Sequence, residues 1–163
     1  MLSNETTEIS VIKRNGKKEE VSFDKILKRI KQIGNENNLS INYVPLAIKV
    51  IEQMYDKITT TQLDELTAEQ CATMSSNHYD YGILASHILI SNLQKNTLNS
   101  YRETTEKLYL NQTNGKANSL VSEELWEVLQ LPEFQEIDNV LDYSRDFLFD
   151  YFGFKTLERN YLQ

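Results

Sequence analysis

Three cations near the start of the chain have the types and spacing that could bind phosphate. Lys13 and Arg14 fall at the end of a predicted strand, and Lys25 falls in the first turn of a predicted helix. The free N–H groups and the positive dipole end of a helix N-terminus favour an anion. A hairpin folded over such a helix end, with two or three cations facing it, would bind phosphate. A plainer interpretation stays open, because edge lysines on exposed hairpins also prevent aggregation.

The sequence around these cations predicts a β-hairpin. Residues 9–13 and 19–23 are expected to form two short strands. Asn15 and Gly16 lie between them, and both residues tolerate the positive φ that a type I′ turn demands. We therefore expect a type I′ turn at this position.

Helices are predicted after the hairpin. Asp24 is expected to cap the first of them, and Gly34 with Asn35 to end it. Asn42 is expected to cap the second helix, and one of the threonines at 59–61 the third. Together with the hairpin, these helices predict a mainly α fold with a small N-terminal β-hairpin.

The second half of the chain is also predicted to be helical. A fourth helix is expected over residues 79–95, with apolar residues on more than one face, which is typical of a helix at the centre of a bundle. Residues 99–111 look helical but polar, and residues 114–116 are expected to form a loop. A further helix is predicted to end before Pro132.

Composition limits the possible functions. The 163 residues include 24 acidic and 17 basic ones, so we expect no nucleic-acid partner and no membrane partner over the whole surface. Cys71 is the single cysteine, and the two histidines lie nine residues apart, so we expect no metal site. The first ten residues lack the features of a signal peptide, and no apolar run approaches about 20 residues. We therefore expect a cytoplasmic protein.

Several segments resemble a known family. Residues 11–26 read VIKRNGKKEEVSFDKI and resemble the signature of the ATP-cone, a regulatory nucleotide-binding domain found at the N-terminus of many ribonucleotide reductase large subunits. Asn15 stands where that signature usually has Asp. The likeness continues in ITTTQLD (58–64), HYDYGILA (78–85), ISNLQK (90–95) and FGFKTLER (152–159). Tyr79 and Gly82 replace the usual Pro and Ala. In order, these segments resemble the N-terminal part of a class I large (alpha) subunit.

The resemblance implies a domain organisation. Residues 1–97 would be the ATP-cone, a helical bundle that binds the allosteric nucleotide. Residues 98–163 would begin the helical N-terminal domain of the reductase large subunit, with the catalytic barrel beyond them. The parent protein would be a ribonucleoside-diphosphate reductase. Its chemistry needs a redox cysteine pair and a thiyl cysteine, so we expect no catalytic residue in this chain, which should be inactive alone.

The resemblance also implies an effector and a site. ATP would activate and dATP would inhibit, with Mg²⁺ accompanying either nucleotide, and both would control the oligomeric state. Asp24 and Lys25 would face phosphates, Thr60 and Asp64 would reach base or ribose, and Lys95 would close on the phosphates. Carried over by position, the nucleotide-binding residues would be Lys13, Arg14, Glu19, Glu20, Val21, Ser22, Phe23, Asp24, Lys25, Ile26, Thr60, Asp64 and Lys95.

The implied partners are the rest of the large subunit, the radical-generating small subunit and further copies of the chain. Two alternatives stay open. The chain could be a free-standing ATP-cone sensor that regulates a partner protein without catalysis, or a structural helical module that binds no nucleotide. Individual residues also have plainer roles, because Thr60 could be a helix cap and Lys95 a cation at a helix C-terminus.

Overall fold

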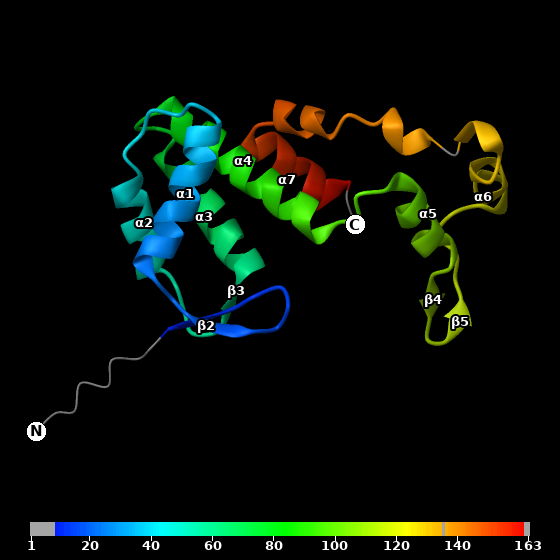
Figure 1. The fold of residues 1–163 in the computed structure, drawn as a ribbon, viewed down its shortest axis with the longest axis horizontal. Helices are drawn as coiled ribbons and strands as arrows, with labels where there is room; N and C mark the ends of the chain where they lie inside the picture. Colours follow the sequence, from blue (N-terminus) through cyan, green and yellow to red (C-terminus); the bar gives the residue numbers. More distant parts are fainter. Residues whose placement is uncertain (1–8, 135, 162–163) are drawn as a thin grey trace, which may run out of the picture. The chain divides into compact units, whose positions relative to one another are not determined.

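The fold is mainly α-helical with a small N-terminal sheet, as the sequence predicts. The computed structural model describes residues 9–134 and 136–161, which divide into two compact units. The first unit contains the residues up to 92 together with those from 147 onward, and the second contains residues 93–146. Figure 1 shows the course of the chain through its elements. The expected domains, residues 1–97 and 98–163, stay a prediction.

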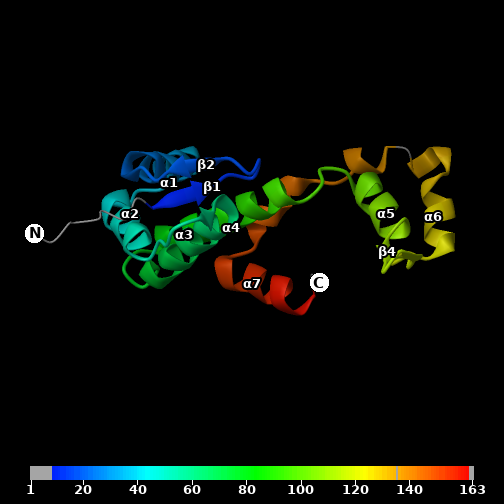
Figure 2. The ribbon, with the colours of Figure 1, turned by 90° about the horizontal axis from the view of Figure 1, so that it is seen from below.

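A sheet of very short strands organises the start of the first unit. Its order is β2 (Lys18–Glu20), β1 (Ser10–Ile12) and β3 (Ile58–Thr59). β1 pairs antiparallel with β2, as Figure 2 shows, and parallel with β3. β3 was not predicted from the sequence, because two residues are too few to show the alternation of a strand.

The hairpin turn differs from the predicted type I′ turn. Gly16 has a φ of +77°, but Asn15 is not among the residues with positive φ. The N–H of Gly16 donates to the carbonyl of Lys13 at 2.8 Å, and the N–H of Lys13 donates to the carbonyl of Lys17 at 2.9 Å. These bonds define a three-residue loop, in which a type I turn is followed by a left-handed glycine.

The helices of the first unit follow the predicted order. They are α1 (Phe23–Glu36), α2 (Tyr43–Glu52), α3 (Thr60–Met74), α4 (Tyr79–Asn96), whose end enters the second unit, and α7 (Tyr151–Asn160). Asn42 caps α2, and Thr59 caps α3 in a reciprocal capping box with Gln62, which confirms both predicted caps. Among the described residues, no helix combines the length and apolar character needed to cross a membrane.

Both predicted ends of α1 are wrong. The N-cap is Ser22, whose backbone is extended, and Asp24 lies within the first turn, where the helix dipole also favours an acidic residue. At the other end, α1 continues past Gly34 and Asn35. Gly34 is retained inside the helix because the ring of Tyr43 from α2 packs against it, leaving no room for a side chain.

α4 lies in the core of the first unit, as its broad apolar surface predicts. Its buried residues are Tyr81, Leu84, Ala85, Ser86, Ile88, Leu89, Ile90 and Asn92. Fully buried side chains from the other elements join them, including Ile30 of α1, Leu46 of α2 and Ile58 of β3. Cys71 of α3 is also fully buried, and this burial raises the pKa of its thiol. It therefore behaves as a small core residue rather than a nucleophile.

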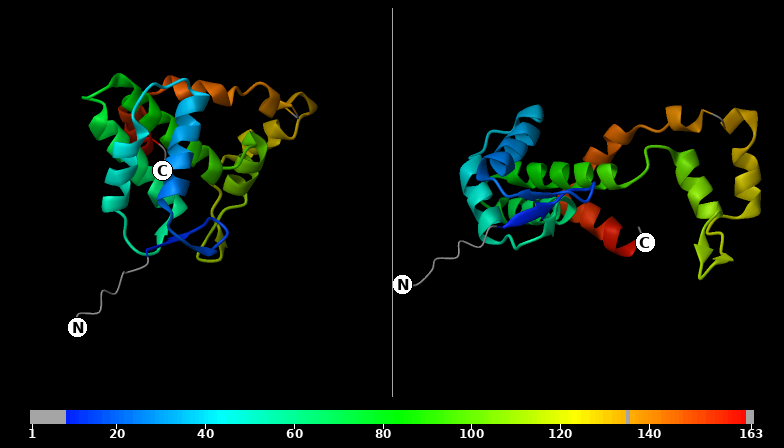
Figure 3. Two further views of the ribbon diagram at one scale, coloured as in Figure 1. Left: turned by 60° about the vertical axis from the view of Figure 1, so that its left-hand side comes forward. Right: turned by 60° about the horizontal axis from the view of Figure 1, so that its bottom comes forward.

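The second unit consists of short elements, visible in Figure 3. They are α5 (Tyr101–Tyr109), β4 (Gln112–Thr113), β5 (Lys116–Ala117), α6 (Glu123–Leu129) and the 3₁₀ turns Pro132–Phe134, Ile137–Asn139 and Tyr143–Leu148. Asn114 and Gly115, with φ of 54° and 74°, join β4 to β5 by a type I′ hairpin turn where only a loop was predicted. Tyr109 and Trp126 stack with ring centroids 4.7 Å apart, which connects α5 to α6.

The Gly34→Ala replacement should lower the free energy of unfolding by about 1–3 kcal/mol. The added Cβ would fall 2.5 and 2.6 Å from two ring carbons of Tyr43, whose hydroxyl donates to the carbonyl of Leu39 at 2.9 Å. Urea unfolding followed by circular dichroism measures the effect. Gly82→Ala in α4 is the matched control, because its Cβ would make an ordinary 3.5 Å contact with Ser75. Equal losses in the two variants would contradict this packing role.

Candidate functional site

The register of the sheet brings two predicted site residues together. Ile12 of β1 lies opposite Thr59 of β3, so the next residues, Lys13 and Thr60, leave the same end of the sheet on neighbouring strands. Both line a cavity of about 420 Å³, together with the first turns of α1. The complete lining is Val11, Lys13, Glu19, Glu20, Val21, Ser22, Lys25, Ile26, Arg29, Thr60 and Leu63.

The cavity has a charged part and an apolar part. Lys13, Lys25 and Arg29 supply cations, and the apolar side chains are Val11, Val21, Ile26 and Leu63. The side chain of Ser22 makes no capping hydrogen bond, so it does not occupy the first N–H groups of α1. A ligand with an anionic end and a flat, less polar end fits this arrangement, and the volume lies within the range of about 300–1,000 Å³ that is usual for small ligands.

Glu19 of β2 bridges the two lysines of the cavity. One carboxylate oxygen pairs with the ammonium of Lys13 and the other with the ammonium of Lys25. These hydrogen bonds lower the pKa of Glu19 from 4.5 to about 2. Because the folded-state pKa is depressed, the pairing stabilises the fold above about pH 4.5, and this stabilisation is lost as the pH falls toward 2.

Asp64 of α3 forms a second ion-pair cluster beside the cavity. Its side chain is only 7% exposed, and both of its oxygens accept hydrogen bonds from Arg29 of α1 at 2.8 Å. The guanidinium of Arg14, in the hairpin loop, lies 3.6 Å from the same carboxylate and donates to Oδ1 of Asn92 at 2.6 Å. Bidentate pairs of this kind are the strongest and most directional ion pairs. The cluster therefore connects the hairpin with α1, α3 and α4.

The structure gathers most of the predicted site residues around one cavity. Those that line it are Lys13, Glu19, Glu20, Val21, Ser22, Lys25, Ile26 and Thr60. Arg14 and Asp64 belong instead to the adjoining ion-pair cluster. Phe23 is exposed, and Asp24 lines a shallow groove on the outer side of α1. Lys95 lies in the last turn of α4, within the second unit, and its role in the site stays a prediction.

Arg29 is a site residue that was not predicted from the sequence. Arg29 lines the cavity and holds Asp64, which is 35 positions away in the chain. One signal could have indicated it, because Arg29 follows Lys25 by four residues and so lies on the same face of the helix. Asn92 was also missed. Its buried amide accepts from Arg14 and donates to the carbonyl of Thr61 at 3.3 Å.

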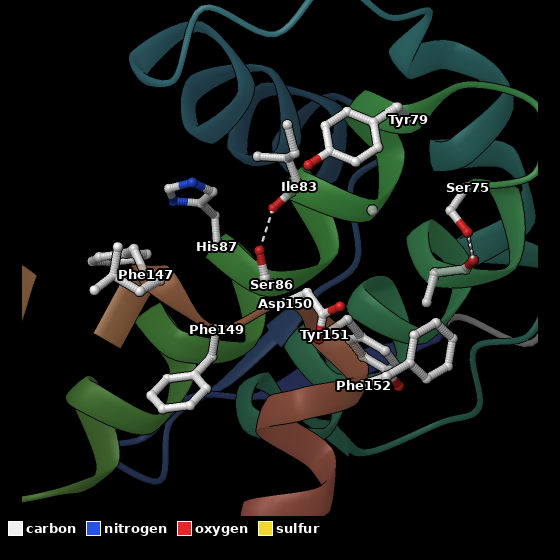
Figure 4. Close-up of a pocket in the computed structure, with 13 residues that line it drawn as sticks. Ser75, Tyr79, Ile83, Ser86, His87, Phe147, Phe149, Asp150, Tyr151 and Phe152 are labelled. Carbon is white, nitrogen blue, oxygen red and sulfur yellow. Dashed lines mark hydrogen bonds between the residues drawn. The ribbon is translucent and has the colours of Figure 1, made fainter. Parts of the chain in front are cut away.

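A second cavity, of about 510 Å³, is lined by α4 and by the segment that leads into α7 (Figure 4). Its walls are rich in aromatic side chains, and His87 stacks on Phe147 with ring centroids 4.7 Å apart. None of the described residues that line it is a lysine or an arginine. The hydroxyl of Ser86 donates to the carbonyl of Ile83, and Asp150 caps α7. Its walls therefore offer no cation for a phosphate.

The Arg29–Asp64 pair should show an interaction free energy of about 1–3 kcal/mol in a double-mutant cycle. Loss of Arg29 leaves the carboxylate of Asp64, which is only 7% exposed, without its bidentate partner in a region of restricted hydration. Urea unfolding of Arg29→Gln, Asp64→Asn and the double variant gives this value. The exposed pair Lys155–Glu158 is the control, with an expected coupling below about 0.5 kcal/mol. Equal couplings in both cycles would contradict a structural role for Asp64.

The depressed pKa of Glu19 can be tested by titration. Carboxyl ¹³C NMR between pH 6 and pH 3 should find Glu19 still largely ionised at the acid end, since its pKa is about 2. In Lys25→Ala the pKa should rise toward 4.5, because one of the two ammonium groups is lost. Lys28→Ala, on the same helix, should leave the titration unchanged. A Glu19 pKa near 4.5 in the unaltered chain would disprove the bridge.

The chain is similar in sequence to known proteins over most of its length. The family described as the ATP cone domain matches residues 9–96, which include the cavity and its ion-pair cluster. The chain is 43% identical to the ribonucleoside-diphosphate reductase large subunit of Dictyostelium discoideum, over 98% of this chain and 19% of the relative. Those of Variola virus and Arabidopsis thaliana are 44% and 43% identical, over 93% of this chain. The chain spans about a fifth of the length of these relatives. The match over residues 9–96 shows that the chain belongs to the ATP-cone family.

Proposed function

We propose that this chain is the allosteric regulatory region of a ribonucleoside-diphosphate reductase large subunit. Its cavity would bind ATP as an activator or dATP as an inhibitor of deoxyribonucleotide synthesis. The observation on which this proposal mainly rests is the cavity at the start of α1, where Lys13 and Lys25 face one another across Glu19. The similarity to large subunits over 93–98% of the chain supports it.

The two halves of the cavity suggest how a nucleotide would bind. The phosphates would lie near Lys13, Lys25 and the first N–H groups of α1, and the base near the apolar side chains of Val11 and Leu63. Among the described residues, no group of three or more His, Cys, Asp or Glu is arranged to hold a metal ion. Mg²⁺ therefore enters this proposal only together with the nucleotide, whose phosphate oxygens are the ligands it prefers.

ATP and dATP differ by one hydroxyl group, and Asp64 is the candidate to detect it. A carboxylate accepts a hydrogen bond from a ribose hydroxyl, but in this chain Asp64 already accepts two from Arg29. A ribose hydroxyl at Asp64 would donate to a lone pair that Arg29 leaves unused, and a deoxyribose would lack this hydrogen bond. A difference of about 1–3 kcal/mol between the two nucleotides in their preference for one quaternary state would suffice for a regulatory switch.

The proposal includes partners and a compartment. The rest of the large subunit, a radical-generating small subunit and further copies of the chain would receive the signal, and all would act in the cytoplasm. The proposed chemistry needs three cysteines, whereas this chain has only Cys71, which is buried. A free-standing ATP-cone sensor is the less favoured alternative, because the similarity to large subunits extends well beyond residue 96.

The double replacement Lys13→Ala with Lys25→Ala should abolish binding of both ATP and dATP. Each lost ammonium–phosphate contact is worth about 1.5–3 kcal/mol, so together they should weaken binding by roughly 10²- to 10⁴-fold. Isothermal titration calorimetry of the chain with each nucleotide and Mg²⁺ measures this change.

The double replacement Lys28→Ala with Lys31→Ala is the matched control. Both residues line the outer groove of α1 and not the cavity, so this variant loses the same net charge without altering the cavity. Its affinity should stay within about threefold of the original, because exposed charges at a distance are screened by salt. Unchanged binding in the Lys13 and Lys25 variant would refute the site.

A further inference from the structure

Glu19 occupies the position between the two lysines that a phosphate would need. Its carboxylate pairs with Lys13 and Lys25 at the same time, one oxygen to each ammonium. The Glu19 side chain is 29% exposed, whereas those of Lys13 and Lys25 are 48% and 65% exposed. The most enclosed member of this trio is therefore an anion inside a cavity proposed to bind anions.

The geometry of the sheet explains why Glu19 faces this way. Val11 of β1 and Glu19 of β2 are directly opposite in the antiparallel ladder, so their side chains lie on the same face. Lys13 follows Val11 by two residues and returns to that face. All three side chains line the cavity. The strand register thus places the acid beside the two ammonium groups.

We propose that Glu19 is an internal competitor for the effector, whose phosphates must displace the Glu19 carboxylate from Lys13 and Lys25. Glu19 would thereby raise the nucleotide concentration at which the cone fills. This inference rests on the proposed nucleotide site, and it gives Glu19 a role opposite in sign to that of the lysines. Glu19 is among the residues predicted to line the site, and in this proposal it weakens the binding of the phosphates.

Two physical arguments support displacement. Carboxylate and phosphate are both oxyanions, and holding both against the same ammonium groups would place like charges a few ångströms apart. Ion pairs between exposed side chains are weak, so phosphates can replace the carboxylate without disrupting the fold. The low pKa of Glu19 is consistent with this, because the acid stays charged at neutral pH and cannot relieve the conflict by taking up a proton.

The test uses the Glu19→Gln variant and a probe without base or sugar, inorganic tripolyphosphate. Calorimetry of the full chain at fixed ionic strength should show about tenfold tighter binding of tripolyphosphate than in the original chain, equivalent to about 1.4 kcal/mol. Glu65→Gln, an exposed position on α3, removes the same charge outside the cavity and should change the affinity less than threefold. In the original chain, tripolyphosphate should also shift the ¹³C resonance of the Glu19 carboxyl group.

Each result of these binding measurements either supports or overturns the proposed role of Glu19. Equal or weaker tripolyphosphate binding by Glu19→Gln would overturn the inference, and so would a similar gain in Glu65→Gln, which would indicate a general charge effect. Tighter tripolyphosphate binding together with weaker ATP binding would support displacement and add a contact from Glu19 to the nucleoside. Failure of the original chain to bind either ATP or tripolyphosphate would refute the proposed function itself and this inference with it.

Discussion

The parallel pairing of β1 with β3 connects the two segments that build the cavity. β3 leads directly into α3, and β1 leads into the hairpin loop, so the pairing of Ile12 with Thr59 fixes the start of α3 beside Lys13. Asp56 strengthens this junction, because its carboxylate accepts hydrogen bonds from the backbone N–H and the hydroxyl of Ser10 at 3.0 and 2.5 Å. Together with the contacts of Arg14 to Asp64 and Asn92, this junction holds the hairpin over the first turn of α1.

Two carboxylates pair with four cations of the site. Glu19 pairs with the two lysines, and Asp64 pairs with the two arginines, in a protein with a net charge of −7. The two clusters differ in exposure. The cluster around Glu19 is more exposed, so it could exchange its anion at little cost in free energy. The cluster around Asp64 is more enclosed, so breaking it would be costly. In this proposal, ligand exchange and structural stability depend on different, neighbouring carboxylates.

Local signals in the sequence predicted much of the fold. The caps Asn42 and Thr59 and the broad apolar surface of α4 were correctly predicted, since each depends on residues close together in the chain. The hairpin turns were not, because loop length as well as the Asn-Gly dipeptide selects the turn type. Asn15 lies in a three-residue loop and does not have a positive φ, whereas Asn114 lies in a two-residue type I′ turn and has a positive φ.

The candidate site was predictable only in part. The lysines and the start of α1 could be predicted from spacing, and most of the other lining residues from the family resemblance, whereas Val11, Arg29 and Leu63 were not predicted. The pairing of Arg29 with Asp64 depends on how α1 packs against α3, which no local pattern encodes. The bridging position of Glu19 depends on strand register, which a single sequence does not fix for strands of three residues.

The burial of Cys71 has a practical consequence. A thiol that is 0% exposed, with a raised pKa, reacts slowly with maleimide dyes, and it is the chain's single cysteine. A cysteine introduced at an exposed loop position, such as Lys17→Cys, would then take up the fluorophore selectively in the folded chain. Movements of the hairpin could be followed by fluorescence without first removing a native cysteine from the core.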